Sequence, residues 1–396
     1  MNQISKLTVL KEMTHADEAI VSLIKSMRPI SADSHVTEPP DCYVDRIDPK
    51  FRDVAPKVVH DEKRGDLYII DQMPDVVPMG LIAAAGEDPR QMRREGKRFS
   101  DLHRGGWSAK DRIKDMERDG VVAEIVYPTV GMMICNHPNF DYKNACFRAY
   151  NEWLKEYVSG APDKILGIGQ TAARSPAETV EDLRRIKEAG FIGVMMPGVP
   201  QGDDYDSLSW DPVWRAAIEL DMPLSFHVLT SRTDDTGGLF AGKGRGPKVN
   251  GFQNIIRACQ DIIGMFIYSG VFERHPDLKV VTVEADAGWA PHYTYRMDHA
   301  FERHRFNLDG GSTLKRMPSE YFNDNIYMTF QDDAVAFEFS HLFNPRQLLW
   351  ASDFPHSDST WPNSMGVVAT HAKNMSVEHL KWMVHDNVSE LYKLKL

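Results

Sequence analysis

The 396-residue chain has a formal net charge of −11 and is 42% apolar and 26% charged. The acidic balance excludes a general affinity for nucleic acid or anionic membranes, because both require a basic face. No segment approaches the roughly 18 consecutive apolar residues of a membrane-spanning helix. The first residues lack the apolar core of a signal peptide, and the four cysteines form no CxxC pair. We therefore expect a globular, cytoplasmic protein that acts on a small molecule.

Residues 1–28 carry apolar side chains at helical spacing, which predicts an amphipathic helical extension. Its apolar face is expected to pack on the rest of the chain or on a neighbouring subunit. The extension therefore favours a homodimer or a higher homo-oligomer. The remainder, residues 29–396, is expected to form one domain.

From Pro29 onward, short apolar runs alternate with amphipathic helical segments. Runs that are apolar on both faces and alternate with helices indicate a parallel sheet. The predicted strands are residues 30–33, 121–127, 164–170, 192–196, 223–228, 279–284, 325–330 and 347–352. Eight such units predict a closed (β/α)₈ TIM barrel, in which reactive groups lie at the C-terminal ends of the strands. Periodicity leaves an open doubly wound sheet as the alternative, and the number of strands favours closure.

Two long insertions interrupt the alternation. Residues 38–108 follow the first strand and are rich in Pro, Gly, Arg and Asp, and residues 230–251 follow the fifth strand and contain several glycines. Loops this long without secondary structure are uncommon unless they are functional. Because both follow strand ends on the catalytic side, we expect them to form walls or lids of a substrate pocket. A disordered surface excursion is the alternative.

Metal-competent side chains follow four of the predicted strands. Asp33 and His35 lie at the end of the first strand, and His227, Glu284 and Asp353 end the fifth, sixth and eighth. Asp33 and His35 are two positions apart on a strand, so both side chains point to the same side. Each residue alone has a structural explanation, such as a core histidine or a strand cap. Together, at one rim of a barrel, they predict a single divalent metal ion.

Three other segments have structural explanations. The run of arginines at residues 90–98 is typical of a solvated loop, although an anionic substrate is an alternative partner. Residues 242–246 lack the GxxxxGK[ST] spacing of a phosphate-binding loop, which argues against nucleotide binding. His275 is interpreted as a structural residue. We assign His356, three residues after Asp353, to the catalytic site, where it either contacts substrate or braces that aspartate.

The chain resembles the metal-dependent amidohydrolase superfamily, and within it the branch related to aminocarboxymuconate semialdehyde decarboxylase. The resemblance covers about residues 29–396. The matching segments are residues 32–39 (ADSHVTEP), 270–276 (GVFERHP), 287–291 (AGWAP), 351–356 (ASDFPH) and 386–392 (DNVSELY). These motifs are specific for the family and not for a substrate.

The resemblance implies a (β/α)₈ barrel with one divalent metal, commonly zinc and in some members manganese or iron. Asp33 and His35 occupy the place of the first-strand motif, and His227 matches the histidine ligand of the fifth strand. Asp353 matches the aspartate that binds the metal and handles the proton. Glu284 stands where the decarboxylases carry a histidine. This departure makes Glu284 an additional candidate ligand and argues against decarboxylation.

We therefore predict a zinc-dependent hydrolase in which a metal-activated water attacks a small activated carbonyl substrate, namely a thioester, a lactone or the C–C bond of a β-diketone. The alternative is a non-oxidative, metal-dependent decarboxylase of an aromatic or unsaturated carboxylic acid. A third hypothesis is a barrel that has lost its metal and serves only in binding. In either enzyme, Tyr127 and Arg232 are assigned to substrate binding.

Overall fold

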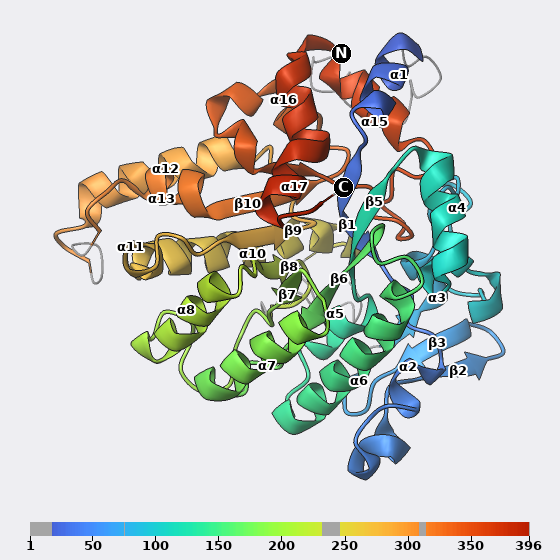
Figure 1. Ribbon diagram of the computed structural model, residues 1–396. Helices are drawn as coiled ribbons and strands as arrows, with labels where there is room; N and C mark the ends of the chain where they lie inside the picture. The colour runs from blue at the N-terminus through green and yellow to red at the C-terminus, as the bar shows by residue number, and fades with distance from the viewer. Residues whose placement is uncertain (1–17, 75, 232–245, 309–313, 396) are drawn as a thin grey trace.

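The computed structural model describes residues 18–74, 76–231, 246–308 and 314–395 (Figure 1). Within these residues, eight parallel strands follow one another in the order β1-β5-β6-β7-β8-β9-β10-β11. Their bounds are Ile30–His35 (β1), Ala123–Tyr127 (β5), Ile165–Gln170 (β6), Gly193–Met195 (β7), Leu224–His227 (β8), Val280–Val283 (β9), Ile326–Phe330 (β10) and Leu348–Trp350 (β11). Each predicted strand is present, and the prediction of a (β/α)₈ barrel is confirmed.

The first and last strands meet at their C-terminal ends. The Asp353 amide donates to the Asp33 carbonyl over 3.0 Å, and the His35 amide donates to the Phe354 carbonyl over 2.7 Å. These backbone bonds bring the two edges of the sheet together and nearly close the barrel. As a result, the polar ends of β1 and β11 share one rim.

Helices between the strands cover the outside of the barrel (Figure 1). The longer helices are α4 (Ala109–Asp119), α6 (Phe140–Val158), α7 (Pro176–Glu188), α8 (Asp211–Glu219), α10 (Gly251–Tyr268), α12 (Ala290–His304), α13 (Pro318–Asn325) and α15 (Ser364–His371). Shorter ones are α5 (Val130–Ile134), α11 (Val271–Arg274), α14 (Ala334–Glu338), α16 (Val377–Lys381) and α17 (Asn387–Leu391). The side chains between strands and helices form one large apolar core.

The insertion at residues 38–108 is not the loop without secondary structure that the sequence suggested. It contains the helices α2 (Asp41–Val44) and α3 (Met79–Ile82) and an antiparallel sheet of β2 (Lys57–Asp61), β3 (Gly65–Ile69) and β4 (Val77–Pro78). The side chains of β2 are exposed or only partly buried. No apolar run therefore marks this strand in the sequence.

The N-terminal extension is described only from residue 18 onward, where α1 (Glu18–Ser26) packs against α15 with Ile24 fully buried. Residues 1–17 lie outside the described residues. So do residues 232–245 of the second insertion, which include Arg232. Packing of the extension on the body agrees with one of the two expected roles, and the oligomeric state stays a prediction.

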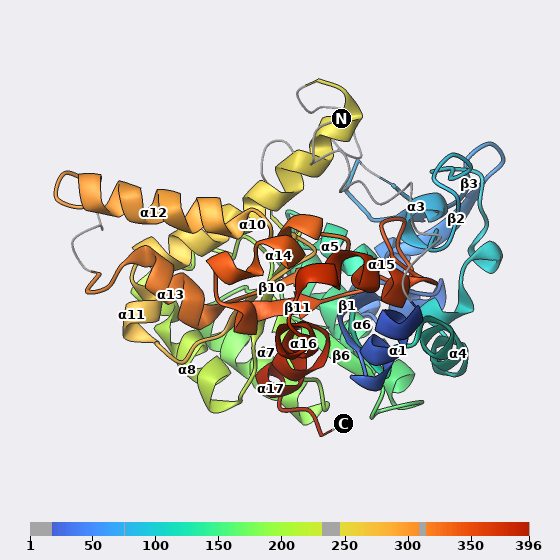
Figure 2. The same ribbon diagram turned by 90° about the horizontal axis from the view of Figure 1, so that it is seen from above.

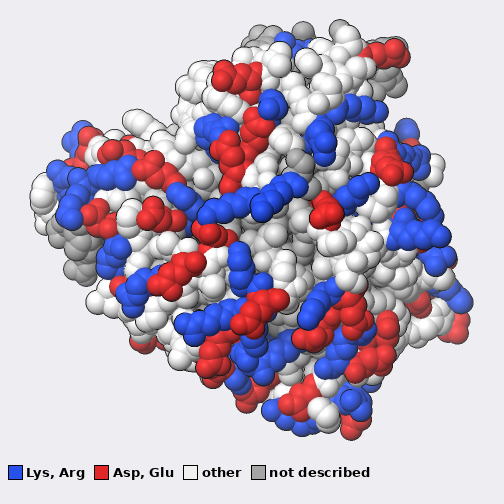
Figure 3. Space-filling view, in the orientation of Figure 1, with Lys and Arg blue, Asp and Glu red and all other residues white. Residues whose placement is uncertain are grey.

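Figure 2 shows α3 and the start of α10 rising on the same side of the barrel. α3 belongs to the first insertion, which follows the C-terminal end of β1. α10 begins at the end of the second insertion, which follows the C-terminal end of β8. On the face seen in Figure 3, basic and acidic side chains are interspersed. Among the described helices, none combines the length and the apolar character needed to cross a membrane.

Candidate active site

Two histidine rings form the centre of the site. The His35 Nδ1 lies 3.0 Å from the Pro128 carbonyl oxygen, and the His227 Nδ1 lies 3.1 Å from the Val228 carbonyl oxygen. A carbonyl only accepts, so each Nδ1 carries the proton and each Nε2 presents a lone pair. The two Nε2 atoms lie 3.2 Å apart. Neutral rings in these tautomers cannot hydrogen-bond to one another, so a cation between them is the favourable arrangement.

Three carboxylates surround the two ring nitrogens. The His35 Nε2 lies 3.5 Å from Asp33 Oδ1, 3.5 Å from Asp353 Oδ1 and 3.9 Å from Glu284 Oε2. The His227 Nε2 lies 3.7 Å from Asp33 Oδ1 and 3.6 Å from Glu284 Oε2. The structure therefore brings together all five residues that the sequence proposed for the metal. The donor atoms of Asp33, His35, His227 and Glu284 lie within 4.8 Å of one another, and those of His35, Glu284, Asp353 and His356 form a second such group.

The hydrogen bonding of the carboxylates tests whether a cation fits. Asp33 Oδ1, Glu284 Oε2 and both side-chain oxygens of Asp353 are buried without a hydrogen-bond partner among the described residues. A buried carboxylate oxygen with no partner is costly. A divalent cation with oxygen and imidazole ligands would satisfy these atoms together, so the residues fit the metal that the sequence predicts.

The charge states of the apo cluster lead to the same conclusion. Burial and the charges of Asp353 and Asp33 raise the pKa of Glu284 well above its ordinary value. Burial and the charge of Asp33 do the same for Asp353. Burial, together with the rings of His356 and His227, lowers the pKa of His35 well below its ordinary value. A bound cation lowers the pKa of each carboxyl group, which opposes the effect of burial. It also binds the neutral form of the imidazole.

The backbone is strained where two of the carboxylates leave their strands. Glu284 has φ 59° and Asp353 has φ 54°, both in the left-handed region that non-glycine residues rarely adopt. Such residues cost about 1–3 kcal/mol each and persist where the surrounding structure fixes them, often at functional sites. At both positions the conformation directs a carboxylate toward the histidine pair.

His356 forms a pair with Asp353 and is held from behind by Thr129. The Thr129 hydroxyl donates to the Val36 carbonyl over 2.6 Å, so its oxygen accepts from the His356 Nε2 at 2.9 Å. The His356 Nδ1 therefore presents a lone pair 3.1 Å from Asp353 Oδ1. Burial lowers the pKa of His356 to about 4. The neutral ring is thus placed to exchange a proton with Asp353.

Arg112 of α4 holds the backbone of two segments that carry site residues. Its side chain is fully buried, forms an ion pair with Glu124, and donates to the carbonyl oxygens of His35 over 2.6 Å and Phe354 over 3.4 Å. It thereby fixes the backbone on which both β1 and β11 end. The sequence analysis missed this residue. The available signal was its spacing: Arg112 precedes the buried Met116 by one helical turn, so both side chains lie on the buried face of α4.

Glu38 is a second residue whose role the sequence analysis missed. Its buried carboxylate accepts from the amides of Thr129, Val130 and Gly131 over 3.1–3.2 Å and from the Tyr43 hydroxyl over 3.3 Å. It therefore fixes the segment that carries Thr129. The signal was its position in the motif of residues 32–39, three residues beyond His35.

An apolar cavity opens above the cluster. Its floor includes Glu284, Asp353 and His356, and its walls come from β4 and α3 of the first insertion, from α5 and from the start of α10. Ile82 of the first insertion and Phe252 of α10 line it. The expectation that the insertions form walls of the pocket is therefore met for the first insertion. For the second insertion, the lining residues Leu229 and Phe252 flank residues 230–251 on either side, and none of its described residues lines the cavity.

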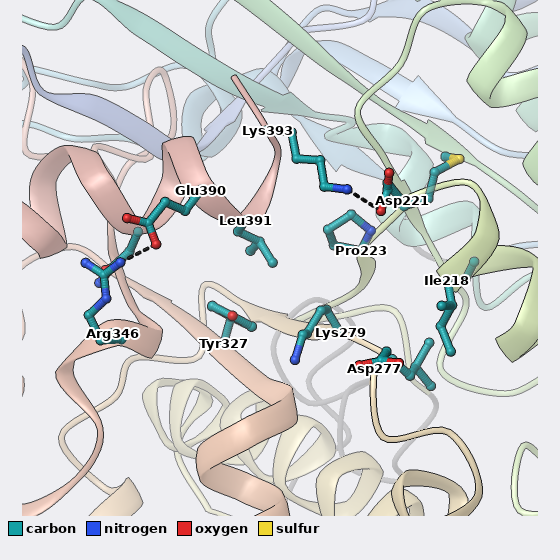
Figure 4. A pocket seen from close by; sticks show the side chains of 14 residues that line it. Ile218, Asp221, Pro223, Asp277, Lys279, Tyr327, Arg346, Glu390, Leu391 and Lys393 are labelled. Carbon is teal, nitrogen blue, oxygen red and sulfur yellow. Dashed lines mark hydrogen bonds and ion pairs between the residues drawn. The ribbon is translucent and has the colours of Figure 1, made fainter. Parts of the chain in front are cut away.

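A second cavity lies at the opposite end of the barrel, where Pro223 and Lys279 precede β8 and β9 (Figure 4). Its charged side chains are largely paired: Lys393 with Asp221 at 2.5 Å, and Arg346 with Glu390. Catalytic residues in this fold lie at the C-terminal strand ends. This cavity is therefore not the candidate active site.

The two residues assigned to substrate binding have different outcomes. Tyr127 is fully buried behind the histidines, with its ring centroid 5.4 Å from that of His227 and its hydroxyl bonded to Ser225 Oγ at 2.9 Å. It is not among the described residues that line the apolar cavity. Arg232 lies outside the described residues. A substrate contact of either residue stays a prediction.

Comparison with known proteins agrees with this geometry. A family model described as Amidohydrolase matches residues 33–394, nearly the whole chain. The chain belongs to the amidohydrolase family. It is an enzyme of the amidohydrolase superfamily, as its motifs predicted.

Two curated proteins similar to this chain are named as decarboxylases. A 2-amino-3-carboxymuconate-6-semialdehyde decarboxylase from Dictyostelium discoideum is 25% identical over 217 residues, which are 53% of this chain and 56% of that protein. The chain spans less than two thirds of the length of the curated relatives that it matches.

Solved structures share the fold at lower identity. An amidohydrolase from Mycobacterium avium subsp. paratuberculosis K-10 superposes with a TM-score of 0.73 at 22% identity, over 92% of this chain and 99% of that one. A 5-carboxyvanillate decarboxylase from Novosphingobium aromaticivorans, complexed with manganese and 4-hydroxy-3-methoxy-5-nitrobenzoic acid, superposes with a TM-score of 0.59 at 22% identity, over 72% and 79%. A divalent metal is thus bound in a structural relative.

Proposed function

We propose that this amidohydrolase is a non-oxidative, metal-dependent decarboxylase of an aromatic carboxylic acid that carries a hydroxyl group beside the carboxylate. The observation that carries the proposal is the Asp353–His356 pair, which lies beside the predicted metal ligands at the floor of an apolar cavity. Relatives named as decarboxylases support this alternative over the hydrolase that the sequence analysis favoured.

The residues present can hold a divalent cation through Asp33, His35, His227 and Glu284, with Asp353, 3.5 Å from the His35 Nε2, as a further ligand. A bound cation would supply a Lewis acid that neutralises the substrate carboxylate and the adjacent phenol oxygen. Imidazole nitrogens and carboxylate oxygens are ligands for both manganese and zinc, so the donor atoms do not distinguish the two ions. Manganese is the ion bound in the decarboxylase relative.

The chemical step requires a proton at the ring carbon that bears the carboxylate. Asp353 lies at the cavity floor, where its Oδ1 is 3.1 Å from the His356 Nδ1. We assign to Asp353 the delivery of that proton to the ring carbon. The bond between the ring and the carboxylate then breaks, its electron pair stays on the ring, and CO₂ leaves. The charge is balanced, since one carboxylate and one proton give one neutral ring C–H and CO₂.

His356 would return the proton to Asp353 after each turnover. Its Nδ1 lies 3.1 Å from Asp353 Oδ1, and its side chain is 11% exposed at the cavity floor. Hydrogen bonding to Thr129 holds it in the tautomer that presents a lone pair to Asp353. The ring therefore links the buried carboxyl to the cavity.

The direct test is the product. Manganese-loaded enzyme is incubated with a panel of 2-hydroxybenzoates, and CO₂ and the decarboxylated phenol are measured together. We expect equal amounts of the two products and no release by Asp353→Asn, which cannot donate the proton. Hydrolysis of a thioester or lactone substrate without CO₂ release would instead support the hydrolase.

A further inference from the structure

The walls of the active-site cavity are apolar. Val77 and Ile82 come from the first insertion, Met132 and Met133 from α5, and Phe252 and Ile255 from α10. Ile82, Met132, Met133 and Ile255 are each at most 9% exposed, whereas Phe252 at the mouth is 47% exposed. A cavity lined in this way favours a ligand whose body is apolar.

The charged side chains that line the described part of the cavity are all of one sign. Glu284, Asp353 and Asp358 line it, and no Lys or Arg does so among the described residues. Arg112, the buried guanidinium near the floor, is already committed to Glu124 and to two backbone carbonyls. A ligand with a second negative charge would therefore lose water there and gain no opposite charge from the described walls.

From these walls we infer the substrate class of the proposed decarboxylase: a 2-hydroxy aromatic acid with one carboxylate, whose far side carries an alkyl or other uncharged apolar group. The single carboxylate and the phenol oxygen face the metal ligands at the floor. The apolar group lies between the methionines of α5 and the first turns of α10. The inference rests on the proposed function, and it excludes dicarboxylates as preferred substrates.

Binding to the manganese-loaded protein tests the inference without turnover. The probes are 2-hydroxybenzoate, its 5-tert-butyl derivative and its 5-carboxy derivative, compared by calorimetric titration with catalytically inert Asp353→Asn as well as with the wild type. Burial of one methylene strengthens binding about fourfold, from about 0.8 kcal/mol. We expect the tert-butyl probe to bind at least tenfold more tightly than 2-hydroxybenzoate, and the dicarboxylate to bind more weakly than either. A dicarboxylate that binds as tightly as the tert-butyl probe overturns the inference.

A charge placed at the cavity mouth provides the second test. Phe252→Arg is expected to abolish the preference for the tert-butyl probe over the dicarboxylate, because it replaces an apolar wall by a cation. Phe306→Arg, at a site that is 77% exposed and remote from the cavity lining, is the matched control and should keep the preference. Thermal melting verifies that both variants fold. Equal selectivity of the two variants contradicts the inference.

The inference and the proposed function fail in distinguishable ways. Preferential binding of the tert-butyl probe without CO₂ release from any probe would leave the substrate class standing and overturn the decarboxylase. CO₂ release with no preference among the probes, or with a preference for the dicarboxylate, would support the decarboxylase and overturn the substrate class.

Discussion

Replacing Arg112 by methionine would separate the two tasks of this residue. Methionine matches the apolar stem of arginine but removes the charge that pairs with Glu124 and the donors that hold the His35 and Phe354 carbonyls. Both members of the ion pair are at most 3% exposed. Removal of one partner of a buried ion pair costs about 3–5 kcal/mol, because the other charge is left uncompensated. That is a large fraction of the roughly 5–15 kcal/mol by which domains are stable.

A double variant distinguishes stability from positioning. Arg112→Met with Glu124→Leu removes the orphaned charge, so it should recover about 2 kcal/mol or more of the unfolding free energy. It does not restore a donor to the His35 and Phe354 carbonyls. We therefore expect manganese affinity to stay at least tenfold below that of the wild type in both variants.

The pH dependence of the single variant has a defined sign. Burial raises the pKa of Glu124 and Arg112 partly offsets this, so the single variant raises it further. A carboxyl whose folded pKa is above its unfolded value loses stability as pH rises through the window between the two. The deficit against the wild type should thus be largest at neutral pH and shrink as pH falls toward the ordinary carboxyl pKa of about 4.3.

The measurements are urea unfolding between pH 5 and 8 and calorimetric titration with manganese. The control is Arg46→Met, which breaks an ion pair with Glu156 whose carboxylate is 63% exposed, and should cost at most about 1 kcal/mol. A loss below about 1 kcal/mol in Arg112→Met would refute the stability argument. Wild-type manganese affinity in the double variant would refute the positioning role.

Three further variants examine individual residues of the site. His227→Ala should lose bound manganese and turnover while the melting transition and circular dichroism stay native, and full metal occupancy would show that the ring is not a ligand. Glu284→Gln should weaken manganese binding at least tenfold, since its unpartnered Oε2 faces both histidines; unchanged affinity and rate would make it a structural residue. Thr129→Val should lower kcat about tenfold with little change in manganese affinity, because it releases His356 and no metal ligand; a loss of metal instead would assign Thr129 to the metal site.

The barrel and the metal-binding cluster could be predicted because both depend on local patterns. Most strands contain a short apolar run, and the alternation along β1 places Asp33 and His35 on one side. Barrel geometry then brings the ends of distant strands to one rim. The positions of His227, Glu284 and Asp353 directly after apolar runs followed from the same reasoning.

The supporting residues could not be predicted because their partners are not side chains that a sequence pattern reveals. Glu38 binds backbone amides and Arg112 binds backbone carbonyls, and these groups are the same in every residue. The strand β2 was missed because its side chains are partly exposed, so it lacks an apolar run. The apolar character of the cavity depends on three segments whose packing the sequence does not specify.

The most direct test of the account is a crystal structure of the manganese-loaded protein, with data collected on both sides of the manganese absorption edge. We predict one anomalous peak between the Nε2 atoms of His35 and His227, about 2.0–2.3 Å from each and from an oxygen of Asp33 or Asp353. A peak at another position, or no peak from protein that binds manganese in solution, would contradict the shared metal centre on which the proposed chemistry depends.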